Sequence, residues 1–126
     1  MNKRYVGGVL AAADGTAETT DARFSTRIRI AGNTIAPCFA IIKQKGYKIE
    51  ARVNKNSSGE YFYTWDAVKE NHHFSAECPV ELLGLISMWE IRGDNWKAND
   101  IEYREYDKFT AEAPVYDNDG NLIENE

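Results

Sequence analysis

The sequence predicts an α+β fold in which an antiparallel sheet of about five strands packs against one main helix at 79–92. Three observations carry this prediction. Before residue 70, short extended runs alternate with turn-forming residues, as they do in antiparallel sheets. A single amphipathic stretch then carries both a helix start signal and a helix stop signal. The length of 126 residues suits one hydrophobic core, so we expect 1–126 to form a single globular domain.

The extended runs before the helix are predicted as strands. The clearest is 23–31. There, Phe24, Ile28 and Ile30 alternate with arginine and serine, which is typical of a half-buried strand with a cationic outer face. The run at 37–44 is apolar in its middle, which suits a strand near the centre of the sheet. The expected strands are 4–12, 23–31, 37–44, 47–53 and 60–68.

The helix predicted at 79–92 has signals at both ends. Pro79 stands where a first helical residue belongs, Glu81 where a carboxylate helps the first turn, and Gly93 where a helix stops. The leucine, isoleucine and tryptophan side chains between them form one broad apolar face. A face of this width allows the helix to lie across a sheet.

Two segments after the main helix allow alternative predictions. A second helix at 99–109 would begin at Asn99 or Asp100, but apolar and acidic residues also alternate there as in a strand. We favour the helix. The segment 114–126 is expected to form either a small hairpin, with its turn at 117–121, or a flexible acidic tail.

The charge of the chain narrows the classes of partner. The net charge is −5 and the pI is near 5.1. Proteins that bind nucleic acids normally present a basic patch, so we expect no nucleic-acid partner. An acidic surface attracts a positively charged protein, although the same charge also serves solubility. We therefore expect that any partner is a basic protein.

The cysteines and the N-terminal run bear on the compartment. Cys38 and Cys78 are far apart and lie beside apolar residues, so buried free thiols are favoured over a disulfide, and a cytoplasmic location is expected. The run at 3–13 resembles a signal peptide, but it is short and is interrupted by two glycines. We interpret it as a first strand. No stretch has the length of a membrane span, so we expect no membrane association.

Two groups of residues resemble metal sites but fail on spacing. The run 117–121 supplies oxygen ligands of the kind that calcium prefers, but an EF-hand loop has glycine at its sixth position, where this chain has Leu122. The neighbours His72 and His73 would point to opposite faces of a strand, which leaves too few converging ligands for zinc. We therefore expect neither a metal nor a cofactor.

One cysteine has a partial resemblance to a catalytic nucleophile. Cys78 would open the main helix, where the helix dipole lowers the pKa of a thiol, and a histidine lies nearby in sequence. The same cysteine serves equally well as a helix cap or as a small buried side chain. No carboxylate is bracketed by apolar residues in a way that suggests a raised pKa, and no glycine-rich loop leads into a helix. We predict no catalytic residue and no enzymatic activity.

The residues after the main helix combine aromatic rings with acidic side chains. Such a patch can anchor a basic partner through a few buried rings and a charged rim. The alternative is a helix-packing layer with a solvated acidic face. The predicted partner-binding residues are Asp94, Trp96, Asp100, Glu102, Tyr103, Glu105, Tyr106 and Asp107.

These features support one leading hypothesis by analogy of type. Small acidic α+β proteins without a catalytic set include bacterial immunity proteins, which block a cognate toxin, and phage-encoded inhibitors of host defence. The leading hypothesis is therefore an inhibitor that binds and neutralises a partner protein, as an immunity protein does.

Two alternatives stay open. One is a small-ligand-binding or enzymatic domain with a pocket between sheet and helix, although the inward-facing residues are almost wholly apolar. The other is a subunit of a structural homo-oligomer. The arginine face at 23–31 opposes self-pairing, unless it meets the acidic tail of a second copy.

Overall fold

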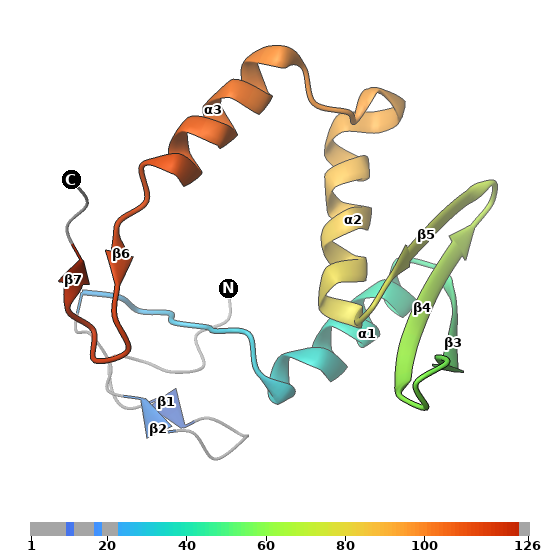
Figure 1. Ribbon diagram of the computed structural model, residues 1–126. Helices are drawn as coiled ribbons and strands as arrows, with labels where there is room; N and C mark the ends of the chain where they lie inside the picture. The colour runs from blue at the N-terminus through green and yellow to red at the C-terminus, as the bar shows by residue number, and fades with distance from the viewer. Residues whose placement is uncertain (1–9, 12–16, 19–22, 124–126) are drawn as a thin grey trace. The chain divides into compact units, whose positions relative to one another are not determined.

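The computed structural model describes residues 10–11, 17–18 and 23–123, which form an α+β structure of short antiparallel sheets and helices (Figure 1). The chain divides into two compact units, Met1–Ile91 and Arg92–Glu126. The elements up to the end of α2 are β1 (Leu10–Ala11), β2 (Ala17–Glu18), the 3-10 turn η1 (Gly32–Thr34), α1 (Ile35–Gln44), β3 (Lys48–Lys55), β4 (Tyr61–Lys69), β5 (His72–Ala76) and α2 (Pro79–Arg92). The elements after it are the 3-10 turn η2 (Gly93–Asn95), α3 (Asp100–Ala111), β6 (Val115–Tyr116) and β7 (Leu122–Ile123).

The first unit is built around a three-stranded antiparallel sheet in the order β3-β4-β5. Ile49, Ala67 and Phe74 lie directly opposite one another across the three strands, so they share one face of the sheet. Both α1 and α2 contribute side chains to the core on this face. The buried apolar residues of the core are Ile42, Tyr47, Ala67, Leu82 and Ile86.

Residues 37–44 were expected as a strand, and this expectation is wrong, because they belong to the helix α1. A short apolar run fits a buried strand and a helix equally well, so only the signals at its ends separate them. The stop signal is Gly46, whose φ of 93° is left-handed. Its N–H donates to the Lys43 carbonyl. The Tyr47 N–H donates to the Ile42 carbonyl, which completes a Schellman cap. The side chains of Ile42 and Tyr47 both belong to the core.

Residues 23–31 were also expected as a strand, and they form neither a strand nor a helix. The segment runs extended into η1 (Figure 1, light blue). Its large apolar side chains, Phe24, Ile28 and Ile30, are exposed. An alternating pattern forms a strand only where it can pair with another strand. The largest sheet of the described residues has three strands, so the expectation of about five in one sheet is corrected. Of the expected strand 4–12, only Leu10–Ala11 lies within the described residues, as β1.

The remaining predicted elements are confirmed, with small shifts at their ends. Pro79 is the first residue of α2, and Gly93, at φ 72°, follows its last residue. The Leu82 N–H donates to the Cys78 carbonyl, so Cys78 caps the helix as the first intrahelical acceptor. The expected ranges 47–53, 60–68, 79–92 and 99–109 correspond to β3, β4, α2 and α3.

The strand β5 was not among the five expected strands, although His72 and His73 were treated as neighbours on a strand, and the turn before it has an unusual sequence. Lys69 pairs with His72, which leaves a loop of only Glu70 and Asn71. Glu70 takes a φ of 56°, the left-handed region that two-residue hairpin loops require. Loops of this type usually carry Asn-Gly or Asp-Gly, so the pair Glu-Asn gave no hairpin signal.

The second unit contains no buried residue between 92 and 123. Its hairpin pairs Val115 with Ile123 and Tyr116 with Leu122. The turn closes at Gly120, whose N–H donates to the Asp117 carbonyl. Of the two alternatives expected for 114–126, a hairpin or a flexible tail, the structure shows the hairpin within 114–123. Residues 124–126 lie outside the described part.

Candidate functional site

The helix α3 begins with a complete capping box. The Asn99 side chain accepts a hydrogen bond from the Glu102 N–H at 2.8 Å, and the Glu102 carboxylate accepts one from the Asn99 N–H at 3.1 Å. The same carboxylate accepts a hydrogen bond from Arg92 Nη2 at 2.8 Å. The Arg92 and Asn99 donors hold the pKa of Glu102 below its usual range. Glu102 therefore fixes the start of α3.

The aromatic side chains of α3 are exposed to solvent. Tyr106 is 68% exposed and Phe109 is 82% exposed, one helical turn further along. Tyr103 is also exposed and lies one turn before Tyr106. An open groove runs along this side of the helix. Its lining residues are Arg92, Ala98, Glu102, Tyr103, Glu105, Tyr106, Lys108, Phe109 and Glu112.

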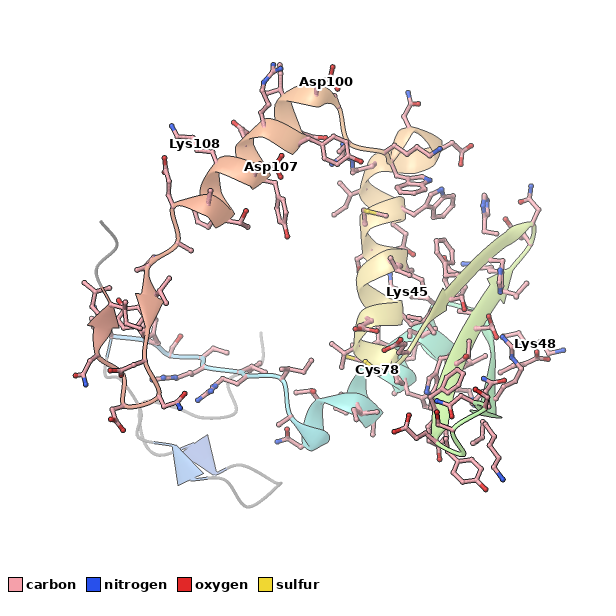
Figure 2. All side chains as sticks on the ribbon, in the orientation of Figure 1. Lys45, Lys48, Cys78, Asp100, Asp107 and Lys108 are labelled. Atoms are coloured by element: carbon pink, nitrogen blue, oxygen red, sulfur yellow. The ribbon has the colours of Figure 1, made fainter. Side chains whose placement is uncertain are left out.

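The structure brings together half of the predicted partner-binding residues. Those that line the groove are Glu102, Tyr103, Glu105 and Tyr106. Asp100 and Asp107 are seven positions apart, so they share a side of α3 that faces away from Phe109. Figure 2 labels both on the helix. Asp94 lies in η2, and Trp96 follows it with a half-exposed ring. These four residues are not part of the groove.

The prediction omitted Phe109 and Glu112, which also line the groove. Helical spacing could have identified both, because Phe109 is seven positions after Glu102 and Glu112 is seven after Glu105. Arg92 was not among the predicted site residues, and its ion pair with Glu102 was not foreseen. The hydrogen bond with Glu102 and its negative charge raise the pKa of Arg92 above its usual value.

The negative charge of the chain is concentrated in the second unit. Residues 92–126 contain ten acidic and four basic residues, a net charge of −6. Residues 1–91 contain ten acidic and eleven basic residues, a net charge of +1. The exposed aromatic face thus belongs to the unit whose field attracts cations.

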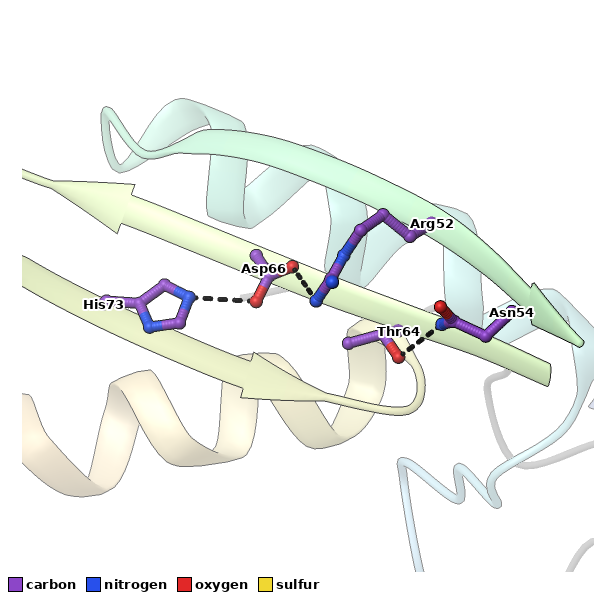
Figure 3. Close-up of polar contacts among 5 residues, drawn as sticks. All are labelled: Arg52, Asn54, Thr64, Asp66 and His73. Carbon is purple, nitrogen blue, oxygen red and sulfur yellow. Dashed lines mark hydrogen bonds and ion pairs between the residues drawn. The ribbon is translucent and has the colours of Figure 1, made fainter. Parts of the chain in front are cut away.

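A second polar cluster lies on the open face of the sheet (Figure 3). Asp66 of β4 accepts hydrogen bonds from His73 Nε2 at 2.9 Å and from Arg52 Nη2 at 3.0 Å. The side chain of Asp66 is only 11% exposed. Its bonds to His73, Ser75 and Arg52 hold the pKa of Asp66 below its usual range, against the opposing effect of burial. Because the donors come from β3 and β5, the cluster ties the three strands together.

The two histidines have separate roles. The His72 ring lies on the Trp89 ring, with centroids 4.2 Å apart, whereas His73 contacts Asp66 on the opposite face of the sheet. Sequence reasoning placed the two histidines on opposite faces but did not foresee the contact with Asp66. Among the described residues, no group of three metal-ligating side chains could hold a metal ion.

The two cysteines and the tail turn were the remaining candidates from the sequence. Cys38 and Cys78 are free and half-buried. Burial raises the pKa of Cys38, and Cys78 adds to the effect, which is opposite to what a nucleophilic thiol needs.

The Asp117 carboxylate accepts hydrogen bonds from the backbone N–H groups of Asn121 and Asp119, so it stabilises the hairpin turn. These bonds hold the pKa of Asp117 below its usual range, with Asn121 contributing most.

Comparison with known proteins gives no assignment, because no family model, curated protein or solved structure matches this chain. Within the described part of the chain, no helix is both long enough and apolar enough to cross a bilayer.

Proposed function

We propose that this protein binds a basic partner protein and neutralises it, as a bacterial immunity protein does with its cognate toxin. The observation that carries the proposal is the aromatic face of α3. Tyr106 and Phe109 are largely exposed there, in a unit with a net charge of −6. An apolar helix face that its own unit leaves uncovered is typical of a docking surface.

The aromatic residues would supply most of the binding free energy. An aromatic side chain buries roughly 150–250 Å² when it is covered, and tyrosine is enriched among the residues that dominate interfaces. Tyr103, Tyr106 and Phe109 follow one another along α3 at three-residue steps, so one partner element lying along the helix can cover all three. We assign the anchoring role to these rings.

The acidic residues would select the partner and speed its approach. Complementary charge at the rim of an interface mainly raises the association rate and excludes partners of the wrong sign. Glu105 and Glu112 line the groove beside the aromatic rings. Glu102 already binds Asn99 and Arg92, so we assign it a positioning role at the start of α3. The proposal places this binding in the cytoplasm, where two free thiols stay reduced.

The proposal is tested first by capture and then by rescue of growth. The tagged full chain is used to capture proteins from the organism that encodes it, at low salt, where acidic interfaces bind best. The Tyr106→Ala, Phe109→Ala double variant is used in parallel. The matched control is Ile91→Ala, an 84% exposed apolar residue of α2 that does not line the groove. We expect one stoichiometric basic protein, retained by the control and lost by the double variant.

The captured protein is then expressed alone and together with each variant. We expect it to arrest growth alone, and the wild-type chain and Ile91→Ala to restore growth. The double variant should not restore it. If the captured protein is harmless, or if both variants protect equally well, the neutralising function of the α3 face is refuted.

A further inference from the structure

The segment 23–31 has the side-chain pattern of a strand but belongs to no sheet of the described residues. Phe24, Ile28 and Ile30 are all exposed, and Ile30 is the most exposed of them at 72%. The segment contains three arginines and no acidic residue. It is therefore an extended, cationic and partly apolar length of chain, of the kind that adds to the edge of a sheet.

The β6–β7 hairpin is a short sheet that an added strand would stabilise. Each of its strands is two residues long, and two-stranded hairpins of this size are marginally stable without a third strand or a covering helix. The four apolar side chains of the hairpin are exposed. They are Val115, Tyr116, Leu122 and Ile123.

The charges of the two segments are opposite. From 109 to 126 the sequence contains five acidic residues and no lysine or arginine. Glu112 precedes the hairpin, and Asp117 and Asp119 lie in its turn. By contrast, β3, an edge strand of the large sheet, carries Lys48, Arg52 and Lys55 against the single acidic residue Glu50, and this positive balance would repel a cationic strand.

We propose that the chain self-associates by strand addition, with 23–31 of one copy pairing along an edge of the β6–β7 hairpin of a second copy. The backbone groups of 23–31 would then form a ladder with an edge of the hairpin, and Phe24, Ile28 and Ile30 would extend one of its two faces, beside either Val115 and Ile123 or Tyr116 and Leu122. The arginines would face Glu112 and the acidic turn. Each copy offers one basic strand and one acidic hairpin, so two reciprocal contacts close a two-fold dimer.

Self-association of this kind shares only Glu112 with the proposed partner binding, because Glu112 lines the groove of α3 and also precedes the hairpin. It uses 23–31 and the hairpin, whereas partner capture uses the aromatic face of α3. A failure of one leaves the other standing, because charge reversal at 27 and 29 leaves Tyr106 and Phe109 unchanged.

The test is sedimentation equilibrium of the full chain over a range of concentrations, at low and high salt. We expect a reversible dimer that weakens as salt rises. Arg27→Glu with Arg29→Glu should weaken dimerisation by roughly tenfold or more, because like charges then face each other. Lys48→Glu with Lys55→Glu makes the same charge change on exposed residues of β3 and should leave the dimer intact. Circular dichroism checks that each variant is folded.

A charge swap identifies the contact and its intermolecular nature. Glu112→Lys with Asp119→Lys should weaken the homodimer as the arginine reversal does. Mixing the two reversed variants should restore a 1:1 heterodimer, because each basic segment then meets an acidic one in the other copy.

Three outcomes would overturn the proposal. The first is a wild-type chain that stays monomeric at every concentration, as it would if 23–31 were satisfied within its own chain. The second is a dimer that the arginine reversal does not weaken more than the β3 control. The third is a mixture of the two reversed variants that forms no heterodimer.

Discussion

The two units of this chain differ in what holds them together. The first unit buries side chains from α1, β4 and α2 in one core, with Ile42, Leu82 and Ile86 fully covered. The second unit has no buried residue between 92 and 123 and relies on local hydrogen bonds. Those bonds are the capping box of α3, the Arg92–Glu102 ion pair and the Asp117 turn.

Under the proposed function, this difference separates stability from recognition. Burial of apolar surface is the dominant favourable term in folding, so the first unit should set the stability of the protein. Caps, turns and exposed ion pairs contribute about 1 kcal/mol or less each, so the second unit should be held weakly. In return, its aromatic residues remain available to a partner. The following variants test this division.

The largest expected effect comes from the core of the first unit. Leu82→Ala should lower the free energy of unfolding by about 2–5 kcal/mol, because it removes a fully buried side chain and leaves a cavity. Urea denaturation followed by tryptophan fluorescence measures the change. The control Ile91→Ala removes an 84% exposed side chain and should change the free energy by less than about 0.5 kcal/mol. If Leu82→Ala and Ile91→Ala lowered the free energy of unfolding equally, Leu82 would not be part of a packed core.

The next effect comes from the Asp66 cluster and depends on pH. Because the folded pKa of Asp66 is depressed, the carboxylate stabilises the fold above its unfolded pKa of about 3.9. That contribution is lost as the pH falls through the folded value. Asp66→Asn should therefore destabilise the protein near neutral pH, and the loss relative to wild type should shrink below about pH 4.

Urea denaturation at several pH values measures the Asp66 effect. The control is Glu50→Gln, which removes an exposed carboxylate from the neighbouring position on β3. If the free energy of unfolding of Asp66→Asn stayed a constant amount below that of wild type from acid to neutral pH, the Asp66 carboxylate would not stabilise the sheet.

A smaller effect is expected at the start of α3. Asn99→Ala removes the side-chain acceptor of the capping box and should cost about 1 kcal/mol of helix stability. Because no residue between 92 and 123 is buried, the loss should appear as faster amide exchange in the first turns of α3. Exchange in β4 should stay unchanged. Faster exchange in both places would mean that the two units unfold together.

The smallest effect on stability is expected at the proposed recognition face. Phe109→Ala removes a side chain that is 82% exposed, so the free energy of unfolding should change by less than about 0.5 kcal/mol. Partner capture should nevertheless fall sharply. A large loss of stability on thermal denaturation would instead indicate that Phe109 packs inside the folded protein.

The elements with signals at both ends were predictable from the sequence. Pro79 and Gly93 define α2, and the asparagine cap with Glu102 defines the start of α3. For α1 the periodicity was uninformative, because an apolar run of this length suits a strand as well as a helix. Only the Schellman cap at Gly46 separates the two, and a glycine in sequence indicates a bend in either case. The segment 23–31 shows the converse, since its pattern is strand-like but no sheet of the described residues includes it.

The candidate site was predictable to the extent that it is helical. Glu102, Tyr103, Glu105 and Tyr106 share the groove because they lie on one helix, and the same spacing extends to Phe109. The Asp66 cluster was not predictable. Its members come from three strands, and their contacts depend on a register that includes the unforeseen strand β5.

The meander order of the sheet has a consequence for the folding pathway. Each strand pairs with its neighbour in sequence, and the link between β4 and β5 is only two residues long. Local pairing closes short loops, so the sheet can assemble early and at little entropic cost. The core is completed only when Leu82 and Ile86 reach Ile42 from the far end of that meander. We therefore expect the return of α2 onto the sheet to limit the folding rate, and the sheet to form during synthesis before α2 has emerged.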